Sequence, residues 1–380
     1  MPVRVRHVVC VIATLASVVL AGCTDGAPDE RQVRPVSWHS VDLPEGLQPV
    51  TVTRVGDRLL VGAATQHASS VPRLLLLGSG HRWTSIPLTA RSYYAHRARW
   101  KSVISNGHRI YALGQASGGA HGNPRWTAWS GAVSGVREDP QPVDTFGGEG
   151  AGVLTGLALL GPKPVIIGSW TNATVGLDVS VWTLSGHAWT RQSSAGSALA
   201  SDRSALNSVR AVVRAGPGVV LAGSVTTLGG GQVGLVPAIW RRSSPTGSWL
   251  RLLLPAGDAG EATGASCDSS SCLVVGYVGT RLALWSVHDL TVARDDTLPA
   301  VPVGLNTVSL VARPEQSRAT IVTTSGGRSR VLSKGAAGWS TTPGPTGTAT
   351  GWAVLGPRTF LITTRPDGRP TLWAGRVTSR

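Results

Sequence analysis

The chain has 380 residues, of which 42% are hydrophobic and 14% are charged, so it can bury a sizeable core and is not a disordered polyelectrolyte. Abundant Gly (48) and Pro (24), with 14 Trp against 2 Phe, favour many short strands and turns. The formal net charge is +15, but the basic residues are almost all Arg and are scattered along the sequence, which argues against a nucleic-acid-binding surface.

The N-terminus is organised like an export signal. A basic start is followed by the apolar run Val8–Leu20, which is short for a membrane span. The next residues, Leu20–Cys23 (LAGC), resemble the lipobox of bacterial lipoproteins. The resemblance implies that residues 1–22 are a lipoprotein signal peptide and that the Cys23 thiol receives a diacylglyceryl group. An ordinary signal peptide and an uncleaved anchor are the alternatives.

A short polar segment follows the lipobox. Residues 24–36 contain two Pro and no apolar run, so together with the lipidated Cys23 they form a predicted tether, 23–36, between the membrane and a folded domain. Two or more acyl chains such as palmitate hold a protein stably on a bilayer. The sequence therefore predicts a lipid-anchored protein on the extracytoplasmic face of the cell membrane.

The rest of the chain repeats one pattern. An apolar run ending in Gly is followed by a turn, a second apolar run that often ends in Trp, another turn, and a short strand that often starts with Trp. Copies of the pattern begin at Arg58, Arg109, Pro164, Gly218, Cys272, Ala319 and Thr359. Each copy needs one more strand upstream, at the centre of the fold. The candidates are Pro49–Val55, Trp100–Asn106, Val153–Leu160, Val209–Ala215, Ala262–Ser266, Thr307–Ala312 and Gly351–Leu355.

The last copy lacks its closing Trp strand. The domain instead begins with Ser37–Pro44 (SWHSVDLP), which matches Ser248–Pro255 (SWLRLLLP), the closing strand of the fourth copy. This is typical of a ring in which an N-terminal strand completes the last blade. We therefore predict an all-β fold over residues 37–378, a seven-bladed β-propeller closed by its N-terminal strand, with six or eight blades as the alternatives.

Two cysteines remain in the mature chain besides Cys23. Cys267 and Cys272 stand in the sequence CDSSSC, and an even pair in an exported protein predicts a disulfide. We expect it to link the first and second strands of the fifth blade. Metal binding is disfavoured because no His or second Cys pair lies nearby in the sequence.

A turn in the third copy carries a family resemblance. Ser185–Thr190 (SGHAWT) resembles a degenerate Asp-box of the sialidase-like propellers, whose full motif is Ser-x-Asp-x-Gly-x-Thr-Trp. The Ser, one Gly and the Trp are kept, while the Asp is missing. Asp-boxes are structural turns, so the resemblance implies a propeller blade and carries no activity with it.

One connection between blades is unusually rich in Arg and aromatic residues. Arg91–Trp100 (RSYYAHRARW) joins the first blade to the second, and such connections line the face where propellers usually bind ligands. The alternative is a solvated loop folded over its own blade. Because Arg and Tyr are hot-spot residue types, we expect ligand contacts from this connection and from one further aromatic residue. The candidates are Arg91, Tyr93, Tyr94, His96, Arg97, Arg99, Trp100 and Trp170.

Catalytic motifs are missing from the sequence. It has no G-x-S-x-G elbow, no H-E-x-x-H and no phosphate-binding loop. We therefore expect a non-catalytic binding or scaffold module without a cofactor or metal. Its partners would be the membrane, through the lipid, and an envelope protein or glycan, with no nucleic acid, and the chain would be a monomer. The alternatives are a sialidase-like envelope glycoside hydrolase and a structural partner of a membrane sensor or assembly complex.

Overall fold

The computed structural model describes residues 37–376, apart from 67–69, 79–81, 119–122, 230, 305–306 and 313–318. The predicted signal peptide, Cys23 and the tether therefore lie outside the described residues. Within the described ranges no helix is long and apolar enough to cross a membrane. The helices there are one 3-10 turn, η1 (Ala95–Arg97), and one short α-helix, α1 (Val143–Phe146).

The strands form seven sheets, which we number as blades in chain order. Blade 1 contains β2 (Leu47–Val55), β3 (Arg58–Thr65), β4 (Pro72–Leu77) and β5 (Trp83–Ile86). Blade 2 contains β7 (Arg99–Ser105), β8 (Ile110–Ala116), β9 (Arg125–Ala132), β10 (Gly135–Glu138) and the added edge strand β6 (Leu88–Thr89). Blade 3 contains β11 (Ala151–Leu160), β12 (Lys163–Thr171), β13 (Leu177–Ser185) and β14 (Ala188–Gln192). Blade 4 contains β15 (Ala205–Ala215), β16 (Gly218–Gly229), β17 (Gln232–Arg242) and β18 (Leu250–Leu253).

The remaining three blades follow the same order. Blade 5 contains β19 (Gly260–Cys267), β20 (Ser271–Val278), β21 (Arg281–His288) and β22 (Thr291–Arg294). Blade 6 contains β23 (Leu310–Ala312), β24 (Thr320–Ser325), β25 (Arg328–Gly335) and β26 (Gly338–Thr346). Blade 7 contains β27 (Thr348–Leu355), β28 (Arg358–Thr364), β29 (Pro370–Gly375) and β1 (Trp38–Ser40). Neighbouring strands pair antiparallel, except that β6 pairs parallel to β10.

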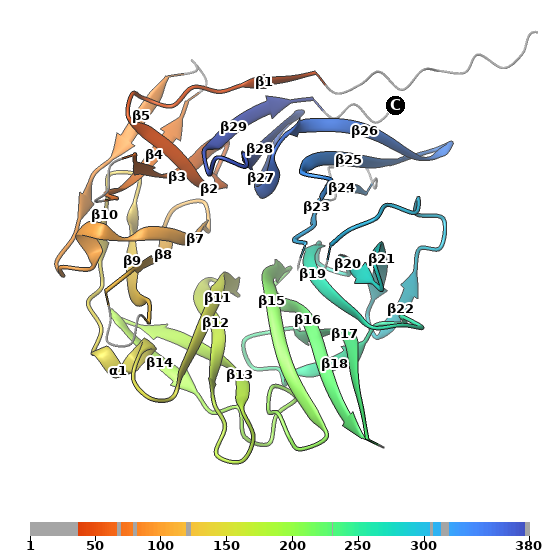
Figure 1. The fold of residues 1–380 in the computed structure, drawn as a ribbon. Coiled ribbons are helices and arrows are strands. Elements are labelled where there is room, and N and C mark those ends of the chain that lie inside the picture. Colours follow the sequence, from red (N-terminus) through yellow and green to blue (C-terminus); the bar gives the residue numbers. More distant parts are fainter. Residues whose placement is uncertain are drawn as a thin grey trace, which may run out of the picture. The chain divides into compact units, whose positions relative to one another are not determined.

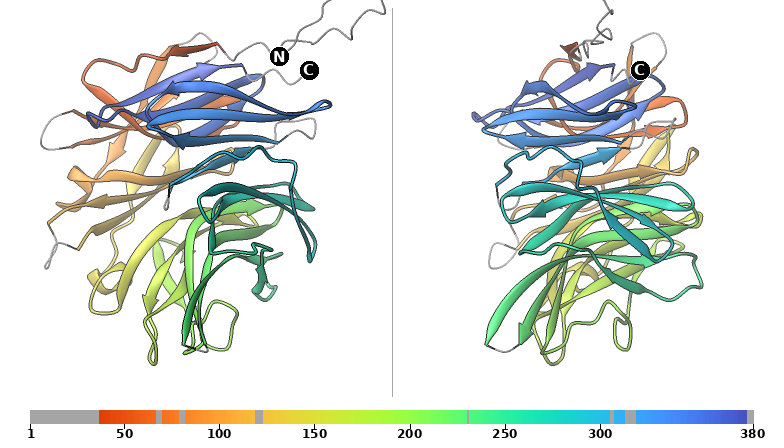
Figure 2. Two further views of the ribbon diagram at one scale, coloured as in Figure 1. Left: turned by 45° about the vertical axis from the view of Figure 1, so that its right-hand side comes forward. Right: turned by 90° about the vertical axis from the view of Figure 1, so that its right-hand side faces the viewer.

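The sheets are arranged around a central axis (Figures 1 and 2). Each innermost strand contacts the innermost strands of both neighbouring blades, and β27 contacts β2, so the cycle is complete. The fold is a seven-bladed β-propeller, as the repeat predicted. The proposed innermost strands are all confirmed in place, although β23 starts at Leu310 and is shorter than expected.

The N-terminal strand closes the ring. In β1, Trp38 pairs with Gly375 and Ser40 pairs with Trp373 of β29, antiparallel. The match between Ser37–Pro44 and the closing strand of the fourth copy predicted this pairing. Closure gives β29 a hydrogen-bonded neighbour on its outer side and removes an exposed edge.

The repeated Trp residues lie between blades. Trp129, Trp182, Trp240 and Trp285 on the third strands are fully buried. Three of them also bind the connection that enters their own blade, because the indole N–H donates to a backbone carbonyl there. The acceptors are Thr145 O for Trp182 at 2.8 Å, Ala198 O for Trp240 at 3.0 Å and Pro255 O for Trp285 at 2.8 Å. A buried Trp needs such a partner for its N–H.

The repeated Gly has a different cause. Among the described residues, six of the seven innermost strands carry a β-bulge. In blades 1 to 5 the Gly that ends the apolar run lies on the second strand, paired with a residue next to the bulge. At two of these positions, Gly223 and Gly276, an added Cβ would overlap the carbonyl oxygens of Ser208 and Glu261. The bulge therefore requires glycine on the partner strand.

The predicted disulfide is confirmed. Cys267, the last residue of β19, is bonded to Cys272 of β20. The two residues are directly paired in the ladder, with 4.1 Å between their Cα atoms. Asp268 stabilises the intervening turn, because its carboxylate accepts hydrogen bonds from the backbone N–H groups of Ser270 and Ser271.

Candidate ligand-binding groove between blades 2 and 3

A buried carboxylate fixes the loop that enters blade 2. Glu138 Oε2 accepts hydrogen bonds from the backbone N–H groups of Arg91 and Ser92, both at 2.7 Å, and Oε1 accepts one from Ser92 Oγ at 2.6 Å. Ser92 Oγ in turn accepts the N–H of Ala95 at the start of η1. Glu138 is only 3% exposed, so these bonds form away from water. The loop is thus held to the outer strand β10.

This anchoring presents two tyrosines side by side. The rings of Tyr93 and Tyr94 meet edge to face with centroids 5.5 Å apart. Tyr93 is 62% exposed, and the guanidinium of Arg97 lies 4.6 Å from its ring centroid. Tyr94 is half-buried, and the guanidinium of Arg125 on β9 lies 5.9 Å from its ring centroid. Both pairs have the geometry of cation–π contacts.

The other predicted residues of this connection divide into two groups. Arg91, His96 and Arg99 are exposed. Trp100 is buried at 3% exposure, its N–H donates to Arg73 O at 2.8 Å, and its ring packs edge to face on Trp129. The structure therefore places Trp100 in the core between blades 1 and 2. It anchors the strand, while the tyrosines before it face outward.

Trp170 belongs to a separate cluster. It lies on β12 of blade 3, half-buried, with the Arg191 guanidinium 4.6 Å from its ring centroid. It also packs edge to face with the buried Trp182, with ring centroids 6.0 Å apart. Trp170 does not line the cavity that contains Tyr94, so the structure does not bring it together with the loop.

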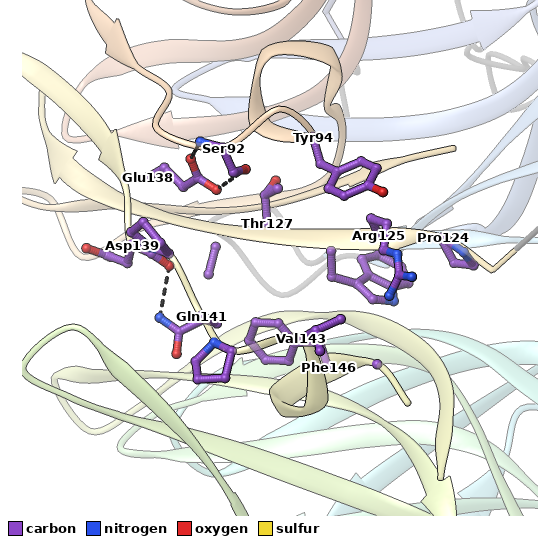
Figure 3. Close-up of a pocket in the computed structure, with 15 residues that line it drawn as sticks. Ser92, Tyr94, Pro124, Arg125, Thr127, Glu138, Asp139, Gln141, Val143 and Phe146 are labelled. Carbon is purple, nitrogen blue, oxygen red and sulfur yellow. Dashed lines mark hydrogen bonds between the residues drawn. The ribbon is translucent and has the colours of Figure 1, made fainter. Parts of the chain in front are cut away.

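Tyr94 instead lines a groove of about 390 Å³ between blades 2 and 3. Figure 3 shows its lining. Three segments contribute: the loop at Ser92 and Tyr94, the start of β9 at 124–128, and the connection 138–147 that includes α1. Arg125, Phe146 and Val143 lie towards the end that contains Tyr94, and Glu138, Asp139 and Gln141 lie towards the other (Figure 3).

The second end of the groove is held by a network across the two blades. Asp139 Oδ1 lies 2.6 Å from His187 Nδ1, and His187 Nε2 lies 2.8 Å from Arg137 Nη2. Because a guanidinium only donates, Nε2 must accept and Nδ1–H donates to Asp139. Gln141 adds bonds to Asp139 O, His187 O and Trp189 N. These contacts join the connection after β10 to the turn before β14.

Both carboxylates at this end hold protein groups. Glu138 binds the loop, and Asp139 binds His187, with its second oxygen buried and without a hydrogen-bond partner in the described part of the chain. Further along the same connection Asp144 and Glu149 are exposed, and neither lines the groove. The hydroxyl and backbone N–H of Ser204, with the N–H of Ala205, bind Asp202 and lower its pKa. Among the described residues, no three His, Cys, Asp or Glu side chains gather in a way that could hold a metal.

Sequence reasoning missed Arg125, Phe146 and Gln141. Arg125 stands at the start of a repeat strand, and the other two lie in the connection that follows β10. They could not be linked to Tyr94 from the sequence, because they come from separate segments that only the fold brings into one groove. The one available signal was the cluster of Arg and aromatic residues at Arg125-Trp126.

Comparison with known proteins supports the fold alone. No protein-family model matches the chain, and no curated protein matches its sequence. Among solved structures, the β-propeller domain of the Trilobed protease from Pyrococcus furiosus, described as having an open velcro topology, has a TM-score of 0.54 at 8% identity. That match covers 89% of this chain and 96% of the other. A puromycin-hydrolyzing peptidase of Mycobacterium tuberculosis has a TM-score of 0.56 at 11% identity, covering 91% of this chain and 55% of the peptidase. The Cps50 (Swd1) propeller domain of Myceliophteria thermophila has a TM-score of 0.52 at 10% identity, covering 90% and 100%.

These neighbours do not point to one function. Two come from peptidases, and the third is described only as a propeller domain. Because one fold hosts many functions, the similarity assigns none of them to this chain. The turn Ser185–Thr190 does lie between the third and fourth strands of blade 3, with Gly186 at φ +59°. The proposed Asp-box relationship stays a prediction.

Proposed function

We propose that the chain is a non-catalytic binding module held by a lipid on the extracytoplasmic face of the cell membrane, and that the groove between blades 2 and 3 receives an envelope glycan or protein. The observation that carries the proposal is the pairing of Tyr94 with Arg125 at one end of a 390 Å³ groove, next to the exposed Tyr93–Arg97 pair. Aromatic rings and guanidinium groups together supply stacking surface and hydrogen-bond donors.

The hydrolase alternative has weaker support. Most glycosidases need a pair of carboxyl groups at the bond that they cleave, and sialidases need a Tyr nucleophile together with carboxyl groups. In this groove Glu138 and Asp139 are buried and bound to protein groups, so neither is positioned as an acid towards a ligand. A scaffold in a larger complex would need a broad apolar patch. The exposed large apolar residues of the described chain are instead distributed over blades 2 to 5 and the connections that enter blades 2, 3 and 6.

A triple substitution tests the binding site. Tyr93→Ala, Tyr94→Ala, Arg97→Ala should leave the thermal melt of the full chain close to that of the wild type and abolish partner binding, because each hot-spot truncation costs about 2 kcal/mol or more. The matched control is Asp144→Asn, Glu149→Gln, Asp202→Asn. Glycan arrays and cross-linking pull-downs should register a loss for the first set alone. A loss confined to the control set would support the hydrolase, and a folded triple variant that keeps every partner would exclude the groove.

The proposed lipid anchor and membrane location are tested separately. Metabolic labelling with a palmitate analogue should mark the wild type and not Cys23→Ser, and the variant should leave the membrane fraction. Equal labelling of both proteins would contradict the lipid anchor. It would leave the groove proposal standing, since the two measurements do not depend on each other.

A further inference from the structure

In six of the seven innermost strands, as far as the structure describes them, a β-bulge leaves a residue without a directly paired partner on the second strand. The bulged positions are Val50, Lys101, Thr155, Arg210, Thr263 and Thr350. A bulge re-aims a side chain, and bulges are common beside functional sites. Four of these residues, from blades 2 to 5, line one cavity of about 220 Å³. The same cavity is lined by Val153, Val209, Glu261 and Val308, so it lies in the central channel.

One charged pair in this cavity is already formed. Arg210 Nε lies 3.0 Å from Glu261 Oε2, and the Glu261 side chain is 3% exposed. Ser224 Oγ also donates to Glu261 Oε1 at 2.9 Å. Glu261 therefore has its charge balanced and holds the Arg210 guanidinium in the channel wall. Arg210 itself remains 47% exposed, so it faces the open space of the cavity.

Lys101 is a second cation in the same cavity. Among the described residues its ammonium group has no hydrogen-bond or ion-pair partner. Partial removal from water by the channel wall lowers the pKa of Lys101, with no neighbouring anion to oppose this effect. The described residues that line the cavity thus include two cations, Lys101 and Arg210, and one carboxylate, Glu261.

The lining of the cavity also includes two exposed valines. Val153 is 61% exposed and Val308 is 48% exposed, an unusual state for valines that face the inside of a ring. Thr155 and Thr263 direct their hydroxyl groups to the carbonyls of Val209 and Val275, at 3.4 and 3.5 Å. A ligand that matches this wall combines an anionic group with an aliphatic part.

We propose that the central channel binds a small organic carboxylate, with its anionic end at Lys101 and Arg210 and its aliphatic part against Val153 and Val308. The inference does not depend on the groove between blades 2 and 3, because the two cavities share no residue. A carboxylate at Lys101 supplies the missing opposite charge and raises the pKa of its ammonium. Binding should therefore weaken as the pH rises through the pKa of Lys101 in the free protein.

The lysine content makes this testable. The chain has three lysines, Lys101, Lys163 and Lys334. Reductive ¹³C-methylation keeps their charge and gives each an NMR signal. In the full chain, purified in detergent, titration with hexanoate should shift the Lys101 signal to saturation and raise its pKa. Lys163, exposed on β12, and Lys334, bound to Asp295, should not move.

The controls separate charge from aliphatic contact. Hexanamide should not bind, and Lys101→Gln should weaken hexanoate binding about tenfold or more, measured by calorimetry. Lys163→Gln should bind like the wild type. Equal shifts of all three lysine signals, or none at Lys101, would overturn the proposal. Inorganic phosphate binding as tightly as hexanoate would contradict the role of Val153 and Val308.

Discussion

Lys334 Nζ lies 2.7 Å from Asp295 Oδ2, and this ion pair ties the connection that leaves blade 5 to strand β25 of blade 6. Asp295 also accepts hydrogen bonds from the backbone N–H of Thr297 at 3.0 Å and from Trp339 Nε1 at 3.3 Å. Burial alone would raise the pKa of Asp295, but the bonds from Lys334 and Thr297 outweigh burial and lower it. One carboxylate thus connects three segments at the junction of two blades.

Replacing this carboxylate should give a pH-dependent loss of stability. Since the pKa of Asp295 is lower in the folded state, its contribution is complete above the unfolded value of about 3.9 and fades as the pH falls through the folded value. Asp295→Asn should cost about 1 kcal/mol at neutral pH, because Lys334 is partly exposed and screened. The cost should shrink below pH ~3.

Urea unfolding of the wild type and of Asp295→Asn, at neutral pH and at acidic pH, measures how the cost of the substitution changes with pH. The neighbouring Asp296, 88% exposed and 3.8 Å from Arg294, provides the control, and Asp296→Asn should change the free energy of unfolding little. An equal cost of Asp295→Asn at both pH values would show that the charge of Asp295 does not contribute.

The bulges predict which glycines can be replaced. Gly223→Ala should destabilise the propeller by about 1–3 kcal/mol or more, because the new methyl group would overlap the Ser208 carbonyl oxygen. Gly229→Ala, at the end of the same strand, should be neutral or slightly stabilising, since nothing lies near its Cβ position. Denaturant titration of the two variants gives the comparison. Similar denaturation midpoints for the two variants would mean that the backbone near Gly223 can shift to make room for the methyl group.

The closing strand should be essential. Deleting Ser37–Pro44 removes the partner of β29 and leaves an open edge and uncovered apolar surface in blade 7. We expect the deleted chain to unfold at a much lower temperature or to aggregate. Deletion of residues 24–34, which are polar and precede the repeat, is the control and should not change the melting temperature. If both deletions melt like the parent, β1 is dispensable for the ring.

The Cys267–Cys272 disulfide should make only a moderate contribution to the free energy of unfolding. Because only four residues separate Cys267 from Cys272, loop closure accounts for about 2 kcal/mol in the chain-entropy model. Cys267→Ser, Cys272→Ser should therefore fold and melt at a moderately lower temperature. Non-reducing peptide mapping of the wild type should find the linked peptide. Full alkylation of both thiols without reductant would contradict the bond.

Much of the architecture could be predicted because each blade repeats the same short-range pattern. The Gly and Trp positions mark the second and third strands, and Ser37–Pro44 marks the closing strand. The bulges were not predicted, because they are offsets between two paired strands, and the repeated Gly that accompanies them on the second strand is equally typical of a turn or a strand end. Nor could the groove be predicted, because Tyr94, Arg125 and Phe146 come from three separate segments that only the fold brings together. Trp100 was predicted as a ligand contact because the sequence does not show where the connection ends and β7 begins. It lies on β7 and packs in the core.

The pairing of β1 with β29 also affects how the protein can be made. Strands of blades 1 to 6 find their partners close by in the sequence, so these blades can form as the chain emerges. Blade 7 needs the first and the last strands of the described chain together, and contacts between such distant segments form slowly. The ring therefore stays open until β29 has been synthesised, so the complete propeller can form only after all seven blades have left the ribosome.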